Sequence, residues 1–119
     1  MQKNILITGC SSGLGLALTN YYLEKNYKVF GISRKKSDIT NTNFIHKSFD
    51  LSNISKIKEE LSAFILDIKE IDTVFLNAGM LGKIKILSEL SIQELNEVYA
   101  LNVYANKELL DILMSIKVE

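Results

Sequence analysis

The chain has 119 residues, of which 47% are hydrophobic and 24% are charged. This composition is typical of a globular domain, which argues against a disordered or fibrous chain and predicts one domain over residues 1–119. The 14 basic residues balance the 14 acidic ones, so neither a nucleic-acid partner nor an acidic membrane is expected. The single cysteine, the lack of a signal-peptide pattern and the lack of a long apolar run predict a cytoplasmic protein.

Apolar runs alternate with segments of helical periodicity along the chain. The runs that end at Gly, Ser or Asn predict buried strands, and a capping-box pattern of Ser91 and Glu94 predicts the start of the last helix. The polar segment 34–43 is too short for a crossover helix and is expected to form a loop. We expect strands at residues 3–8, 28–32, 43–49 and 73–76, and helices at 16–25, 55–68 and 91–113. This alternation predicts right-handed βαβ units in an open, doubly wound parallel sheet.

A glycine-rich loop lies between the first strand and the first helix, where backbone N–H groups and the helix dipole can hold a pyrophosphate. Gly9 allows a sharp turn out of the strand, Gly13 lets the backbone approach the phosphates, and Gly15 lets the helix pack closely on the sheet. Ser11 and Ser12 add hydroxyl donors. The spacing Gly-x-x-x-Gly-x-Gly differs from the common Gly-x-Gly-x-x-Gly fingerprint, and no lysine follows that would make a P-loop.

The segment from Thr8 to Gly15 resembles the cofactor motif of the short-chain dehydrogenase/reductase family. Further matches follow in the family's order: Arg34 after the second strand, Asp50-Leu51-Ser52 after the third, Asn77-Ala78-Gly79 after the fourth, and Asn102 in the last helix. The resemblance implies an α/β, Rossmann-like fold with a doubly wound open parallel sheet. Here it would be truncated to about four strands in the order 3-2-1-4, with three main helices.

The resemblance also implies a role for each matching residue. Asp50 and Leu51 would lie near the adenine, residues 77–79 beside the ribose, and Asn102 in the catalytic proton-relay water network. The implied cofactor-binding residues are Gly9, Ser11, Ser12, Gly13, Leu14, Gly15, Arg34, Asp50, Leu51, Asn77, Ala78 and Gly79. Structural alternatives remain: Asp50 as a helix-entry residue, Gly79 as a loop bend, and Asn102 as a polar group of its helix. One position departs from the family, since Leu76 stands where the family usually has a second Asn.

The end of the second strand bears on the choice of cofactor. A site that prefers NAD needs a carboxylate there to bind the ribose hydroxyls, whereas this chain has Ser33 followed by Arg34, Lys35 and Lys36. Because arginine can pair with a 2′-phosphate in bidentate fashion, NADP is favoured over NAD. A solvated basic turn is the alternative explanation.

The family's catalytic Tyr acid, with a Lys four residues later, and its catalytic Ser are expected beyond Glu119. Tyr21 and Lys25 have the Tyr–Lys spacing, but the first helix carries them away from the phosphate-binding end, so packing and surface roles are expected. Cys10 is either redox-sensitive or a small space-filling residue, and His46 is expected to be structural. Neither has a partner set that predicts a metal site or a nucleophilic triad.

Three functions follow from these observations. The first is the dinucleotide-binding part of an NAD(P)-dependent oxidoreductase, inactive alone. The second is a non-enzymatic dinucleotide-binding or scaffold subunit that completes its fold with a partner chain, and the third is a fragment too incomplete to bind cofactor. The strand from Thr73 to Asn77 would be an open sheet edge, which, with the apolar faces of residues 91–114, predicts a homodimer or larger oligomer.

Overall fold

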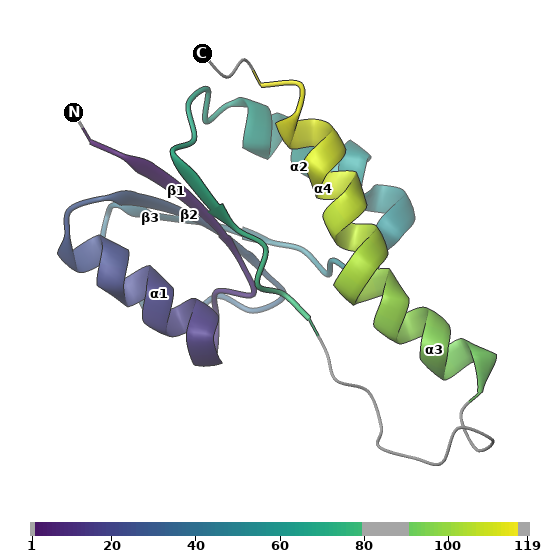
Figure 1. Cartoon of the computed structure of the whole chain (residues 1–119). Coiled ribbons are helices and arrows are strands. Elements are labelled where there is room, and N and C mark those ends of the chain that lie inside the picture. The colour runs from purple at the N-terminus through teal and green to yellow at the C-terminus, as the bar shows by residue number, and fades with distance from the viewer. Residues whose placement is uncertain (1, 80–90, 117–119) are drawn as a thin grey trace.

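A computed structural model describes residues 2–79 and 91–116 of the chain. Four parallel strands form one sheet in the order β3-β2-β1-β4, which confirms the predicted topology. The strands are β1 (Asn4–Thr8), β2 (Lys28–Ser33), β3 (Phe44–Ser48) and β4 (Thr73–Phe75), and the α-helices are α1 (Gly13–Glu24), α2 (Ile57–Leu66), α3 (Ile92–Tyr99) and α4 (Ala105–Leu113). Helix α1 covers one face of the sheet, whereas α2 and α4 lie over the other (Figure 1).

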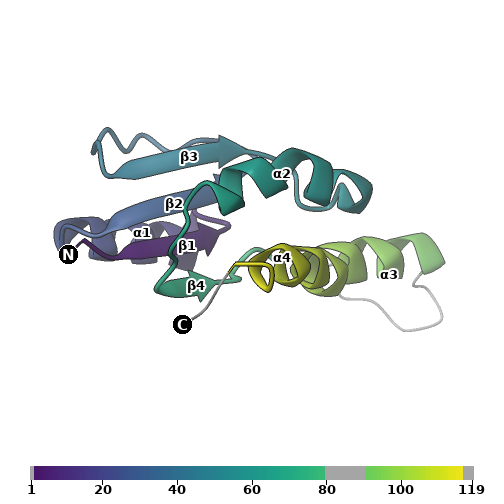
Figure 2. The same cartoon turned by 90° about the horizontal axis from the view of Figure 1, so that it is seen from above.

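Side chains alternate between the two faces along the central strands, as the pleat of a strand requires. On β1, Ile5 and Ile7 pack in the cluster beneath α1, whereas Leu6 packs in the cluster beneath α2 and α4. Val29 and Phe30 divide in the same way on β2. Both faces of these strands are therefore buried, which explains their unbroken apolar sequence. Figure 2 shows the strands side by side in their order across the sheet.

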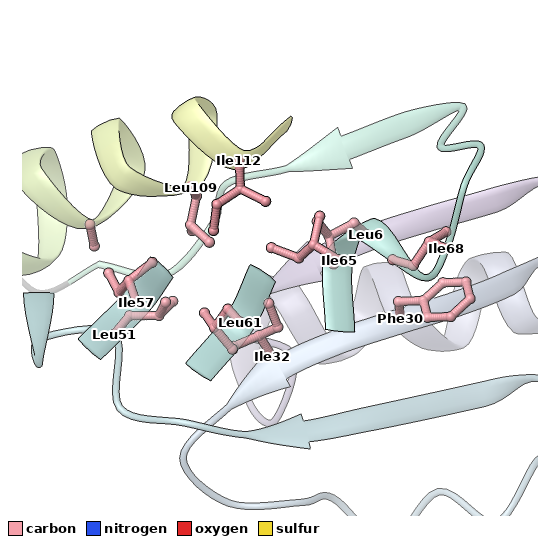
Figure 3. Packing of buried hydrophobic residues seen from close by; sticks show 11 residues of the cluster. Leu6, Phe30, Ile32, Leu51, Ile57, Leu61, Ile65, Ile68, Leu109 and Ile112 are labelled. Carbon is pink, nitrogen blue, oxygen red and sulfur yellow. The ribbon is translucent and has the colours of Figure 1, made fainter. Parts of the chain in front are cut away.

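The larger core cluster lies between the sheet and the pair of helices α2 and α4 (Figure 3). Helix α2 contributes Ile57, Leu61 and Ile65, spaced one turn apart, and all three are fully buried. Leu109 and Ile112 of α4 meet them from the opposite side. This packing fixes α2 and α4 against the strands whose ends form the site described below.

The predicted capping box at the start of α3 is present. The Glu94 N–H donates to Ser91 Oγ at 3.0 Å, and the Ser91 N–H donates to Glu94 Oε2 at 3.2 Å. The helix predicted over residues 91–113 contains one feature that the sequence did not predict, a π-helical segment over Ala100–Tyr104 that joins α3 to α4. A π-helical turn holds one extra residue, so the faces of α3 and α4 are offset in phase at Asn102.

The ends of several elements differ from the prediction by one to three residues, as element ends commonly do. Helix α1 begins at Gly13 because Ser12 takes the extended backbone of an N-cap. The helix predicted over residues 55–68 is a short 3-10 turn, Ile54–Lys56, followed by α2. Strand β4 ends at Phe75, so Leu76 lies just beyond it. Within the described residues, every helix is too short or too polar to cross a membrane.

Candidate functional site

A cleft of about 1260 Å³ opens beyond the carboxyl ends of the strands, where ligands of open α/β sheets bind. It is lined by these predicted cofactor residues: Gly9, Ser11, Ser12, Arg34, Asp50, Leu51, Asn77, Ala78 and Gly79. Its wall also contains Asn20, Ser37, Ile39 and Leu101, which the sequence analysis did not identify as site residues. Asn20 comes from α1, Ser37 and Ile39 come from loop 34–43, and Leu101 comes from the last predicted helix, so their places depend on how these segments fold over the sheet, and no local motif marks them. The structure thus brings together residues from five separate stretches of sequence.

The glycine loop is folded tightly against the start of α1. Gly9 has a φ of +68°, and its N–H donates to the Ile32 carbonyl at 2.9 Å, which extends the pairing of β1 with β2. A Cβ added at Gly15 would lie 1.9 Å from the Gly9 oxygen, so only glycine allows this approach. Gly13 has a φ of +52°, and a Cβ there would meet nothing within 4 Å among the described atoms. The glycine loop therefore packs closely at Gly15, whereas the space beside Gly13 is open among the described atoms.

Helices α1 and α3 begin differently. Helix α3 has its complete capping box, whereas Ser12 at the N-cap of α1 makes no side-chain capping bond, and the first turn of α1 contains no acidic residue. The first N–H groups of a helix have no partner within the helix and carry the positive end of its dipole. The start of α1 therefore leaves donors available to an anion beside Gly13, which fits a pyrophosphate at this place.

The segment after β4 is tied to the glycine loop. Asn77 Nδ2 donates to the Gly9 carbonyl at 3.3 Å, and the Ala78 N–H donates to Thr8 Oγ1 at 3.0 Å. The Thr8 hydroxyl in turn donates to the Phe75 carbonyl at 3.5 Å. Asn77 thus holds the two strand ends in register, and its predicted place beside a ribose stays a prediction.

Asp50 lies at the cleft and at the turn that leads to the next helix, and its predicted place near an adenine stays a prediction. It lines the cleft, and its Oδ1 accepts from the Ser52 hydroxyl at 2.6 Å and from the Ser52 N–H at 3.0 Å, which forms the turn that leads into α2. The Ser52 hydroxyl is the main cause that holds the pKa of Asp50 below its ordinary value, followed by the Ser52 N–H, and the charge of Arg34 acts in the same direction. Leu51 is buried in the larger core cluster while it borders the cleft.

Asn102 lies in the π-helical segment and faces the end of the β4 loop. A Cβ added at Gly79 would be 2.8 Å from Asn102 Oδ1, and Asn106 Nδ2 donates to the Asn102 carbonyl at 3.1 Å. The structure therefore places Asn102 next to Gly79, which lines the cleft. Its part in a proton relay stays a prediction.

The remaining candidates from the sequence lie away from the cleft or have structural contacts. Leu14 is 66% exposed in the first turn of α1. Tyr21 and Lys25 lie on the surface of the same helix, as expected, with Lys25 Nζ 5.0 Å from the centre of the Tyr21 ring. Cys10 is buried, and burial raises the pKa of its thiol, which argues against a reactive thiolate. Residues 2–79 and 91–116 contain no group of three acidic, His or Cys side chains able to hold a metal.

Comparison with known proteins agrees with this geometry. The sequence profile of the family described as short chain dehydrogenase matches residues 3–115. A benzil reductase that forms (S)-benzoin, from Bacillus subtilis, is 34% identical over 104 residues, which are 84% of this chain and 43% of that protein. An NADPH-dependent 3-dehydrocapnine reductase from Ornithobacterium rhinotracheale is 30% identical over 114 residues, covering 88% of this chain and 40% of that protein.

A solved structure shares the architecture over almost the whole chain. The crystal structure of a short chain dehydrogenase family protein from Francisella tularensis superposes with a TM-score of 0.84 at 28% identity, covering 98% of this chain and 47% of that one. The chain therefore spans less than half the length of each of these proteins. Because the family profile matches residues 3–115, nearly the whole chain, the chain belongs to the short chain dehydrogenase family.

Proposed function

We propose that residues 1–119 are the dinucleotide-binding part of an NAD(P)-dependent oxidoreductase and that the cleft binds NADPH in preference to NADH. The observation that carries the proposal is the pairing of two anion-binding features in one cleft. The uncapped start of α1 offers backbone donors beside Gly13, and Arg34 lies at the end of β2, where an NAD site needs a carboxylate. The related reductase from O. rhinotracheale is named as NADPH-dependent.

Each predicted residue has a part in this proposal. The backbone of residues 9–15 holds the pyrophosphate, Arg34 pairs with the 2′-phosphate, Asp50 and Leu51 border the adenine, and residues 77–79 border the ribose. When bound, the nicotinamide supplies the hydride chemistry. Asn102 would orient water near the reacting groups. Tyr21 is the one tyrosine followed four residues later by a lysine, and it is 52% exposed on α1, so we expect no turnover from this chain alone.

The test is a titration of the purified chain with NADPH and NADH, followed by dinucleotide fluorescence or by melting temperature. Losing one charge-assisted contact with the phosphate should weaken NADPH binding about 10- to 100-fold in Arg34→Ala, with the NADH affinity nearly unchanged. Lys25→Ala is the matched control, because it removes the same charge from the far end of α1. Equal affinity for both cofactors would contradict the NADPH preference, absence of binding would contradict the whole proposal, and turnover of a carbonyl substrate would contradict the inactive state.

A second function, as a subunit that pairs with another chain, is favoured by a separate observation. Strand β4 lies at the edge of the described sheet, and large apolar side chains are exposed on α3, the π-helical segment and α4. These are Ile92, Tyr99, Val103, Tyr104, Leu110 and Met114. We propose that this surface and edge form contacts between copies of the chain. Sedimentation should then show a dimer or larger species that dissociates in Tyr104→Lys, and a monodisperse monomer would refute it.

A further inference from the structure

A buried polar cluster lies behind the basic turn at the end of β2. It joins Cys10, after β1, to Ser33, the last residue of β2, and to His46 on β3. Ser33 is 6% exposed, and its Oγ lies 3.4 Å from Cys10 Sγ, 2.6 Å from His46 Nε2 and 2.7 Å from the Lys35 carbonyl oxygen. One buried hydroxyl thus contacts three different parts of the chain.

The position of each proton in this cluster follows from valence. A serine hydroxyl has one proton and two lone pairs, and a carbonyl oxygen can only accept. The Ser33 proton must therefore go to the Lys35 carbonyl, so His46 Nε2 and Cys10 Sγ must both be donors to Ser33 Oγ. Burial, and then the charge of Lys36, lower the pKa of His46, and burial raises that of Cys10. The lowered pKa of His46 favours the neutral ring, whose single proton lies on Nε2 in this arrangement, and the raised pKa of Cys10 keeps the thiol protonated, so Ser33 Oγ is fully satisfied.

The sheet provides the space for this cluster. Gly31 pairs with His46 in the register of β2 and β3, which puts the ring on the same face as Ser33. A Cβ at Gly31 would lie 2.6 Å from Cys10 Sγ, so the missing side chain gives Cys10 room to reach across to Ser33. The Ser33 hydroxyl donates to the carbonyl of Lys35, two residues later. This bond forms a tight turn in which Arg34 is the middle residue.

We propose that Ser33 and His46 are positioning residues that fix the turn of Arg34 and Lys35 and thereby set the preference for a 2′-phosphorylated cofactor. The inference rests on the proposed NADPH site. An arginine fork recognises a phosphate only in a narrow range of orientations, so a backbone held at both sides of Arg34 favours the 2′-phosphate. Ser33 lines the cleft, whereas His46 does not and acts through Ser33. NADH lacks this phosphate, so its affinity should be insensitive to His46.

The test compares three variants in the titration with NADPH and NADH. His46→Leu removes the donor at similar size, Ser33→Ala removes the hydroxyl, and His46→Gln keeps an N–H at the position of Nε2. We expect His46→Leu and Ser33→Ala to lower the ratio of NADPH to NADH affinity about five- to tenfold, the size of one hydrogen bond, with NADH affinity unchanged in His46→Leu. His46→Gln should keep most of the ratio. Equal losses for both cofactors, or an unchanged ratio, would overturn the proposal.

A second measurement needs no cofactor. Backbone nitrogen-15 relaxation by nuclear magnetic resonance should show lower order parameters for residues 34–36 in Ser33→Ala and His46→Leu, and values close to wild type in His46→Gln. Unchanged order parameters in the first two variants would overturn the positioning role. If the unmodified chain has no preference for NADPH, the proposed cofactor fails and the link to cofactor preference fails with it, whereas the order parameters still decide whether the cluster holds the turn.

Discussion

Gly15→Ala tests the close contact on which the glycine loop depends. A Cβ at this position would lie 1.9 Å from the Gly9 oxygen, 2.7 Å from the Gly9 carbonyl carbon and 2.8 Å from Asn77 Nδ2. The nearest atoms are backbone atoms held by the ladder between β1 and β2, so no side-chain rotation relieves the clash. The start of α1 and the loop must move apart.

The size of the effect follows from that movement. Forcing one extra carbon into a packed site costs about 1–3 kcal/mol, and here the backbone must separate by about 1 Å. The bond from Asn77 Nδ2 to the Gly9 carbonyl, already 3.3 Å long, would be lost as well, at about 1 kcal/mol. We expect the free energy of unfolding to fall by about 3 kcal/mol or more, and the melting temperature to fall by about 10 °C or more.

Gly13→Ala is the matched control, because it adds the same carbon two residues away where the described residues leave the space open. Its cost comes from the φ of +52° alone, which is about 1–2 kcal/mol for a residue with a Cβ. Urea denaturation of both variants gives the comparison. If Gly15→Ala is no more destabilising than Gly13→Ala, the tight approach of α1 to the loop is wrong.

Three further predictions concern the core and the titratable groups. Leu61→Ala, in the fully buried centre of α2, should lower the free energy of unfolding by about 2–5 kcal/mol in urea denaturation, and a loss below about 1 kcal/mol would contradict its burial. Burial raises the pKa of the Cys10 thiol, so the protonated thiol should contribute its full stability below the pKa of the unfolded thiol and lose it as pH rises through the pKa of the folded thiol. Cys10→Ser should therefore flatten the decrease in melting temperature at alkaline pH. The Ser52 hydroxyl is the chief cause that lowers the pKa of Asp50, so the carboxylate contributes stability above the pKa of unfolded Asp50, and this stability is lost as pH falls through the pKa of folded Asp50. Ser52→Ala should raise the pKa of Asp50 in a carbon-13 titration. An unchanged pKa would be evidence against the hydrogen bond between Ser52 and Asp50.

Much of the fold could be predicted because its signals are local. Each apolar run that ends at Gly, Ser or Asn became a strand within two residues of its expected bounds, and the Ser91 and Glu94 pair capped α3 as its spacing indicates. The strand order came from the family resemblance, since a sequence pattern alone does not say that β4 pairs with β1. The π-helical segment was missed because residues 92–113 keep an apolar face through it, and no residue type marks the inserted position.

The residues that line the cleft were predictable in part. Gly9, Ser11, Ser12 and the strand-end residues belong to contiguous motifs, so they could be named as candidates from the sequence. The Cys10, Ser33 and His46 cluster could not, because it depends on the register of three strands and on the space at Gly31. His46 was expected to be structural, and in the structure its Nε2 contacts the Ser33 hydroxyl.

The position of β1 in the sheet has a consequence for synthesis of the chain. Its two neighbours are β2, which follows soon after it, and β4, which begins only at Thr73. At ~5–20 residues per second, a ribosome needs about 2–8 s to add residues 34–72 between them. During that interval the nascent chain can pair β1 on one side while its other edge, with Ile5, Leu6 and Ile7, has no strand to bind. A strand whose residues 5–8 are all buried in the native protein is thus left with an open edge on the ribosome.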